Sequence, residues 1–409
     1  MLWRSLDGIV PAVTGAAGLV GVNAAVRSEE SYPPWYRVVI RRGAREVLTP
    51  DGVRIWGDPR WAPTGELAVA AFDGIRRGIV LVDVGDGSVR WWARPAAGSY
   101  RLLALGADAG DAVAVRADAD GAVWRVRARP SGDDERLDRV RARPGGDDER
   151  LELLRAADDV AVSVVRWSHD GVALEGLLAC PAGEGPFPLL VFLHGGPVAG
   201  LACGEHPDLS AWVAAGLAVF MPDFRSSGIG GRELMREAFA REGLPDDDPE
   251  AGEVLTGVDA LVERGVADPG ALYLLGHSYG GYLAGRIIGR DHRFRAAVLC
   301  EAAGDLRLLD PVSRRMQAGW LGGDAEQVPG RWDAASPVRY AGHVRTPVLL
   351  LYAGDRSLTG QGQAWRRALA AAGVEYKLVL VRGADHVFSS GAAQEQLGQA
   401  VIEWCRRYR

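Results

Sequence analysis

The stretch that most constrains this chain is a serine placed between an apolar run and a segment that predicts a helix. Residues 271–275 are apolar and predict a short buried strand, and residues 282–288 predict the helix that follows. Between them, GHSYG at 276–280 fits the G-x-S-x-G pattern, in which a serine occupies a sharp turn from strand to helix. Only small flanking residues avoid collision with neighbouring backbone at such a turn. The predicted strand and helix favour a nucleophilic Ser278 over an ordinary glycine turn.

A serine nucleophile needs a base and a group that holds the base, and both are predicted after later strands. In α/β-hydrolases the chain order is serine, then an acidic residue, then histidine. Asp355 follows the apolar residues 348–352, and His386 follows residues 376–381. Open α/β sheets place their chemistry at the C-terminal ends of the strands. We therefore expect a catalytic triad of Ser278, Asp355 and His386.

The acid and the histidine each have alternatives in the sequence. Asp355 could be a plain turn residue. Asp385 adjoins His386, but an immediate neighbour usually cannot reach around to orient the imidazole. Surface or structural roles suffice for the remaining histidines, which lie in turns or beside glycine at positions 169, 194, 206, 277, 292 and 343.

Two backbone amides are predicted to stabilise the oxygen that becomes negative during acyl transfer. One is the amide of Tyr279, at the start of the helix after the serine. The other is the amide of Gly196 in HGGP at 194–197, which follows the predicted strand 189–193. Tyr282, Arg225 and Trp320 are candidate substrate contacts, although aromatic residues at such spacings more often belong to a core.

The hydrophobic pattern divides the chain near residue 160. In residues 1–160, similar β-type segments begin at Gly18, Gly65 and Gly110, 47 and then 45 residues apart, a period typical of β-propeller blades. A generic β-sandwich or unrelated hairpins are the alternative. In residues 161–409, short apolar strands alternate with helices, which predicts a mostly parallel sheet covered on both faces. The expected fold class is an α/β-hydrolase domain preceded by a small all-β, propeller-like domain.

Composition excludes several classes of partner. The chain of 409 residues has a net charge of -6, which argues against nucleic acid or an anionic membrane as a partner. Its four cysteines are widely spaced and show no metal-ligand spacing, so we expect no metal and no cofactor. Arg4 followed by the apolar residues 9–26 resembles a signal peptide, but Asp7 lies in what would be its basic region and Pro11 interrupts the apolar stretch. We interpret this segment as a blade strand and expect a cytoplasmic protein.

Five motifs together resemble the prolyl oligopeptidase family of serine peptidases, and most closely its acylaminoacyl-peptidase and dipeptidyl-peptidase-like members. They are HGGP at 194, DFRSSGIGG at 223, GHSYGGY at 276, SPVRY at 336 and TPVLLL at 346. The resemblance implies an α/β-hydrolase domain under a propeller, short peptides as substrates, and Ser278, Asp355 and His386 as the triad. The chain departs from the family pattern at Asp223 and Ser226, where asparagine and glycine are usual.

Three functions are compatible with these residues. The first is a cofactor-independent serine hydrolase that cleaves amide bonds of short or N-blocked peptides through an acyl-enzyme. The second is an esterase or acyl transferase that uses the same triad on a small metabolite, since a short propeller would leave the site open. The third is a degenerate hydrolase retained as a binding module. An unpaired blade edge also predicts a homodimer.

Overall fold

The structure is a computed structural model, and it divides into two compact units, one formed by residues up to 161 and one by residues 162–201 and 208–409. Asp355, His206 and Cys203, one of the four cysteines, lie outside the described residues, as do parts of the segments that start at Gly18 and Gly110. The described residues are 22–28, 36–42, 45–50, 53, 55–62, 65–73, 76–93, 99–105, 112–117, 123–128, 135–139, 160, 162–197, 209–227, 231–244, 247–354, 360–388 and 390–409.

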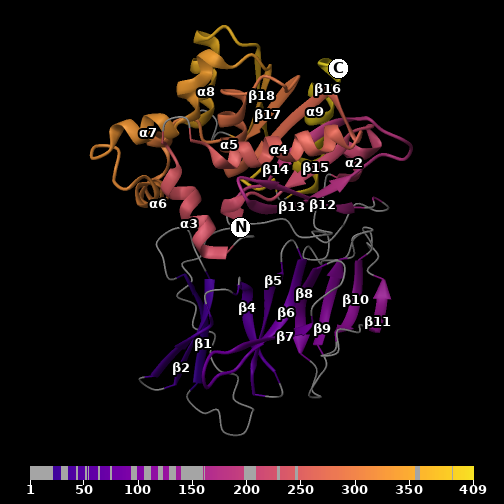
Figure 1. Ribbon diagram of the computed structural model, residues 1–409, viewed down its shortest axis with the longest axis vertical. Coiled ribbons are helices and arrows are strands. Elements are labelled where there is room, and N and C mark those ends of the chain that lie inside the picture. Colours follow the sequence, from indigo (N-terminus) through magenta and orange to yellow (C-terminus); the bar gives the residue numbers. More distant parts are fainter. Residues whose placement is uncertain are drawn as a thin grey trace. The chain divides into compact units, whose positions relative to one another are not determined.

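The N-terminal unit consists of antiparallel sheets formed by strands that follow one another in the chain (Figure 1). Its core combines alternate residues of neighbouring strands, among them Val38, Ile55, Val69 and Val80. This period of two is expected for strands with one buried face. The three sheets of the described part are β1 (Val22–Ser28), β2 (Tyr36–Arg42) and β3 (Arg45–Leu48); β4 (Ile55–Trp61), β5 (Leu67–Asp73), β6 (Arg76–Val82) and β7 (Val89–Ala93); and β8 (Ser99–Leu105), β9 (Ala112–Ala117), β10 (Val123–Ala128) and β11 (Glu135–Arg139).

The C-terminal unit is built on one eight-stranded sheet in the order β12-β13-β15-β14-β16-β17-β18-β19. The first two strands form a hairpin through Asp170 and Gly171, which both have positive φ, and β13 also pairs antiparallel with β15. All later neighbours are parallel. The strands are β12 (Val162–His169), β13 (Val172–Ala179), β14 (Phe187–Leu193), β15 (Ala218–Pro222), β16 (Ala267–His277), β17 (Ala296–Cys300), β18 (Val348–Ala353) and β19 (Tyr376–Val381).

Helices cover both faces of this sheet (Figure 1). The main core joins one sheet face to α4, α5 and α8 through residues such as Val254, Leu283 and Trp365. Helices α2 and α9 contact each other, and α9 packs against β17. The helices are α2 (Leu209–Ala214), α3 (Gly231–Arg241), α4 (Pro249–Glu263), α5 (Tyr279–Ile288), α6 (Pro311–Leu321), α7 (Pro329–Ala335), α8 (Gln361–Ala371) and α9 (Gly391–Arg407), with short 3-10 turns at Arg225–Ser227, Leu306–Leu308 and Pro337–His343.

The expected fold class is confirmed: an α/β-hydrolase sheet follows a small all-β region. The segments predicted as strands at 296–300 and 376–381 coincide with β17 and β19. Because β14, β16, β17, β18 and β19 run parallel, the loops after their C-terminal ends lie along one edge of the sheet.

Candidate active site

Ser278 occupies the turn between β16 and α5 in a strained conformation. Its φ is 55° and its ψ is -115°, a combination that residues with a side chain rarely adopt. The amide of Ser278 donates to the Cys300 carbonyl of β17 over 2.8 Å, which ties the turn to the adjacent strand. Strain of this kind is typical of a serine held clear of the surrounding backbone at a nucleophile elbow.

The glycines around Ser278 are required by close backbone approaches. A Cβ on Gly276 would lie 2.0 Å from the carbonyl oxygen of Gly280. A Cβ on Gly280 would lie 2.1 Å from the carbonyl oxygen of Leu193, at the end of β14. The backbone of the turn therefore packs directly against the start of α5 and against the end of β14. These close approaches explain why the motif has glycine at positions 276 and 280.

His386 connects the serine to a carboxylate, but the carboxylate belongs to Glu301. The Nε2 atom of His386 lies 2.9 Å from Oγ of Ser278. Its Nδ1 atom lies 2.9 Å from Oε2 of Glu301. A carboxylate can only accept, so Nδ1–H donates to Glu301 and Nε2 is free to accept the hydroxyl proton. This is the tautomer that a general base needs.

Glu301 is the first residue after β17 and is held firmly in place. Its φ is 49°, so it is a second strained residue at this edge of the sheet. Its amide donates to the carbonyl of Leu351 over 2.8 Å, and the amide of Ala353 donates to its Oε1 over 2.6 Å. One carboxylate oxygen therefore faces β18 and the other faces His386.

The structure brings together two of the three predicted triad residues, Ser278 and His386. Asp355 lies outside the described residues, so its part in the triad stays a prediction. Reasoning from the sequence missed Glu301, although the same rule could have found it, because Glu301 directly follows the predicted strand 296–300. The chain order serine, acid, histidine is satisfied by Glu301 as well as by Asp355.

His277 supports the loop that carries the base. Its Nε2 atom lies 2.7 Å from the carbonyl oxygen of His386, which can only accept, so Nε2–H is the donor. Burial lowers the pKa of the His277 imidazole to about 4, below its usual value of 6.5. His277 is therefore neutral at pH 7 and acts as a backbone anchor.

This burial predicts an acid sensitivity that can be traced to one residue. Between pH 6.5 and 4 the unfolded chain binds a proton at His277 and the folded chain does not, so stability is lost as pH falls through this range. We expect His277 to account for a loss of about 2 kcal/mol in the free energy of unfolding between pH 7 and pH 5. Denaturant unfolding at both pH values should show a smaller pH dependence in His277→Gln. The matched variant His343→Gln changes an exposed histidine and should keep the pH dependence of the wild-type protein. If the free energy of unfolding falls equally between pH 7 and pH 5 in all three proteins, His277 is not the source of the acid sensitivity.

The two predicted oxyanion donors belong to the residue after the serine and to a loop that passes close to it. Tyr279 is the first residue of α5, and the first amides of a helix have no carbonyl partner within that helix. The HGGP loop passes close by, since a Cβ on Gly195 would lie 3.2 Å from Cβ of Ser278. His194 fixes this loop through contacts of its two ring nitrogens, 2.7 Å each, to Oγ of Ser227 and to the carbonyl of Gly195. The geometry is compatible with amide donors from Tyr279 and Gly196.

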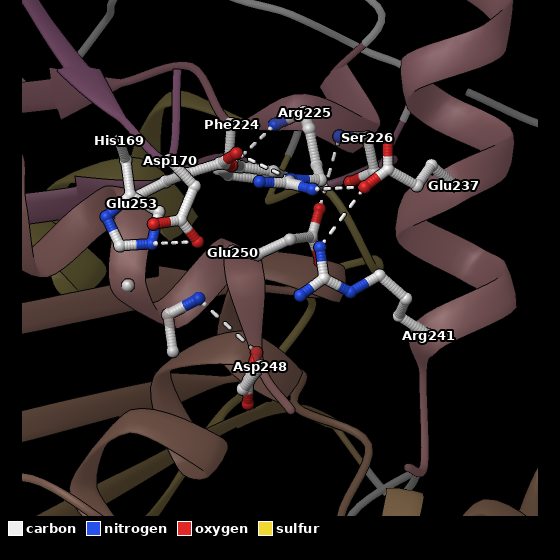
Figure 2. A network of polar contacts seen from close by, with 12 residues as sticks. His169, Asp170, Phe224, Arg225, Ser226, Glu237, Arg241, Asp248, Glu250 and Glu253 are labelled. Atoms are coloured by element: carbon white, nitrogen blue, oxygen red, sulfur yellow. Dashed lines mark hydrogen bonds and ion pairs between the residues drawn. The ribbon is translucent and has the colours of Figure 1, made fainter. Parts of the chain in front are cut away.

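A buried polar network lies behind Tyr279 and connects three segments of the chain. Figure 2 shows Arg225 between Glu253 and Glu237. The guanidinium Nε donates to Glu253 over 2.6 Å, and the backbone amide of Arg225 donates to the other oxygen over 2.9 Å. Burial raises the pKa of Glu253 to about 7, although the paired guanidinium opposes this shift.

Glu250 extends the network to the residue after the nucleophile. Its Oε2 accepts a 2.6 Å hydrogen bond from the Tyr279 hydroxyl. Its Oε1 accepts from the amide of Ser226, a contact that Figure 2 shows. Burial raises the pKa of the Glu250 carboxyl above its usual value. The phenol of Tyr279 is thus anchored in the core, which holds its backbone amide beside Ser278.

The burial of the three candidate substrate contacts argues against direct contact with substrate. Arg225 is 1% exposed and pairs with Glu253. Tyr282 is 3% exposed, and its hydroxyl donates to Glu242 over 2.5 Å. Trp320 is 8% exposed and stacks on Phe239. All three support the site from inside the fold.

No group of three or more His, Cys, Asp or Glu residues in the described part of the chain could hold a metal ion. None of the helices among those same residues is both long and apolar enough to cross a bilayer.

Comparison with known proteins decides the family. The sequence model of the prolyl oligopeptidase family matches residues 207–409, which include Ser278, Glu301 and His386. Residues 207–409 of this chain belong to the prolyl oligopeptidase family. The resemblance expected from HGGP, GHSYGGY and the other motifs is therefore confirmed.

Relatives within the family are similar over about half of this chain. An uncharacterized peptidase of Bacillus subtilis, YuxL, is 32% identical over 235 residues, which cover 54% of this chain and 35% of the relative. The acylamino-acid-releasing enzyme of Arabidopsis thaliana is 25% identical over 235 residues, which cover 54% of this chain and 30% of the relative. These matches span about a third of the length of the two relatives.

Solved structures of family members share the fold over most of this chain. The acylaminoacyl peptidase of Pyrococcus horikoshii superposes with a TM-score of 0.75 at 16% identity, covering 95% of this chain and 62% of that one. A puromycin-hydrolyzing peptidase of Mycobacterium tuberculosis gives a TM-score of 0.71 at 19% identity, covering 95% and 60%. At such identities the likeness establishes the fold.

Proposed function

We propose that this protein is a serine hydrolase that cleaves amide bonds of short or N-blocked peptides through an acyl-enzyme intermediate. The observation that carries the proposal is the 2.9 Å contact between Oγ of Ser278 and Nε2 of His386 at the strained turn after β16. Membership of a peptidase family supports the reaction class. The names of its relatives, acylamino-acid-releasing enzyme and acylaminoacyl peptidase, support blocked peptides as substrates.

The reaction follows from the roles of these groups. The Ser278 hydroxyl adds to the substrate carbonyl while His386 Nε2 takes its proton. The amides of Tyr279 and Gly196 donate to the oxyanion, and one such donor is typically worth about 100- to 1000-fold in rate. The imidazolium then protonates the leaving amine. Water, deprotonated by the same imidazole, finally releases the acid and restores the serine.

A second candidate uses the same groups on a different acyl compound. A serine activated by a general base attacks esters as well as amides, and its acyl-enzyme can be released by an amine in place of water. An esterase or acyl transferase acting on a small metabolite is therefore the alternative.

Matched substrates distinguish the two candidates. We expect the full-length protein to hydrolyse an N-acetylated peptide anilide with a kcat/KM at least about tenfold above that for the same peptide with a free N-terminus, because the family relatives act on blocked peptides. A fluorophosphonate should label the protein and stop turnover. A preference for the ester over the anilide by much more than their difference in chemical reactivity, or acyl transfer to an added amine, would favour the alternative.

Two further proposals come from composition and from the blade pattern. We place the protein in the cytoplasm, because its cysteines show no disulfide spacing. Residues 1–21, which hold most of the pattern that resembles a signal peptide, lie outside the described residues. We also propose a homodimer through the edge of the N-terminal unit, and sedimentation of the full-length protein would test it.

A further inference from the structure

We propose that Glu250, in the first turn of α4, is a positioning residue that holds both donors of the oxyanion hole in place. The inference deepens the proposed function and rests on it, since these donors matter only if Ser278 attacks a carbonyl. The two carboxylate oxygens of Glu250 connect to the two segments that fix the amides of Tyr279 and Gly196.

One oxygen of Glu250 anchors the residue that follows the nucleophile. The hydroxyl of Tyr279 donates to Oε2 of Glu250 over 2.6 Å. Burial raises the pKa of this phenol well above its usual value, so the hydroxyl keeps its proton and acts as the donor. Tyr279 is also the first residue of α5, and its backbone amide is one of the two oxyanion donors that we assign. The anchored phenol therefore limits how far that amide can move.

The other oxygen anchors the turn that holds the HGGP loop. Oε1 of Glu250 accepts from the amide of Ser226 over 3.2 Å, as Figure 2 shows. The next residue, Ser227, places its Oγ 2.7 Å from Nε2 of His194. The ring of His194 also stacks on that of Phe224 in the same turn, with centroids 4.5 Å apart. Because His194 is the first residue of HGGP, this turn connects the loop of the second donor to Glu250.

The neighbouring acid on α4 shows why Glu250 is the common anchor. Glu253, one helical turn further along, accepts from the amide and from the guanidinium of Arg225. Both of these hydrogen bonds lead to one segment, whereas the hydrogen bonds of Glu250 lead to two. Glu250 is only 7% exposed, and a buried carboxylate that lost its donors would leave its oxygens unsatisfied at a cost in free energy. The contacts that join the two halves of the oxyanion hole are therefore retained.

Tyr279→Phe removes the hydroxyl that Glu250 holds and keeps the backbone amide. We expect kcat on the N-acetylated peptide anilide to fall by about tenfold, because the amide loses alignment but not its hydrogen. KM should stay within about threefold, since the oxyanion exists only in the transition state and the tetrahedral intermediate. Glu250→Ala frees both segments and should lower kcat by about 100-fold, the lower end of the loss of a whole donor.

A conservative variant and a matched control separate positioning from general stability. In Glu250→Gln the amide oxygen still accepts from Ser226 and the NH2 group donates to the Tyr279 hydroxyl, so kcat should return to within about fivefold of the wild type. The control is Glu242→Ala, which removes a carboxylate that is 5% exposed and accepts a 2.5 Å hydrogen bond from the Tyr282 hydroxyl on the same helix α5. It should change kcat less than threefold.

A reversible inhibitor reports on the oxyanion hole without turnover. In a peptide aldehyde the carbonyl carbon bonds to Oγ of Ser278, and the carbonyl oxygen takes the place of the oxyanion. Its inhibition constant should rise in proportion to the loss of kcat in Tyr279→Phe and Glu250→Ala. The corresponding peptide alcohol has no carbonyl, so its inhibition constant should stay within about threefold. Thermal melts establish that each variant folds, and Tyr279→Phe decides the question if Glu250→Ala does not.

The outcomes distinguish this inference from the proposed function. If the wild-type protein neither turns over the anilide nor reacts with fluorophosphonate, the proposed function fails and the inference fails with it. If the wild-type protein is active and the folded variants Tyr279→Phe and Glu250→Ala keep both kcat and the affinity for the aldehyde, the inference alone is overturned. It is also overturned if Glu242→Ala or Glu250→Gln lowers kcat as much as Glu250→Ala.

Discussion

Replacing Ser278 by alanine should lower kcat for peptide hydrolysis by about 10⁶-fold while leaving KM and the folded structure nearly unchanged. Removing the nucleophile removes the whole acyl-enzyme pathway, and serine peptidases that lose it fall to this level. The turn should survive, because an alanine at φ 55° carries the same backbone strain as the serine and loses no structural hydrogen bond of the backbone. Initial rates under saturating anilide, with active-site titration by fluorophosphonate, measure the effect.

The matched control for this variant is Ser168→Ala, which changes an exposed serine on the edge strand β12. It should keep wild-type kcat and wild-type labelling. Turnover or labelling retained in Ser278→Ala would contradict the assigned nucleophile, and the hydrolase proposal would fail with it.

The second large effect should come from one methyl group at Gly280. Gly280→Ala places a Cβ 2.1 Å from the carbonyl oxygen of Leu193 and 2.6 Å from that of His194, and both are backbone atoms of the strand and loop beside the nucleophile. Neither can move without shifting β14 or the HGGP loop. We expect a loss of at least about 3 kcal/mol in the free energy of unfolding, at the upper end of overpacking effects. Any folded fraction should be nearly inactive, since the turn that carries Ser278 is displaced.

Gly319→Ala is the matched control, because Gly319 lies inside helix α6 and a Cβ there would meet nothing within 4 Å. The same chemical change should stabilise the protein by about 0.5 to 1 kcal/mol through helix propensity. Denaturant unfolding of the wild-type protein and both variants tests whether Gly280→Ala lowers the free energy of unfolding and Gly319→Ala raises it. A Gly280→Ala protein with wild-type stability would show that the elbow is looser than its close approaches indicate.

Patterns local in the chain predicted most of the site. The apolar run before GHSYG and the helical segment after it indicated Ser278 as the candidate nucleophile, and the strand 376–381 indicated His386 as the candidate base. Each prediction needed only one strand, one turn and the rule that parallel strands end at a common edge. The expectation of a small all-β region before the hydrolase sheet rested on similar local evidence in repeated strand-and-turn segments.

Features that depend on which strands are neighbours were not predictable in the same way. The acid beside His386 could follow any strand near β16, and neither chain order nor spacing separates Glu301 from Asp355. Arg225, Tyr282 and Trp320 carry groups that recognise ligands, but only packing shows that they lie inside the fold. Burial in the folded chain answers the question for Arg225, Tyr282 and Trp320, whereas Asp355 lies outside the described residues.

Two residues at this edge of the sheet, Ser278 and Glu301, have positive φ, and this limits how the sequence can change at both positions. Ser278 and Glu301, on adjacent strands, each hold a conformation that glycine would adopt at lower free energy. Replacing either residue by glycine would therefore relieve backbone strain and at the same time remove a side chain that contacts His386. A side chain kept at both positions thus costs folding free energy that only the contacts with His386 offset.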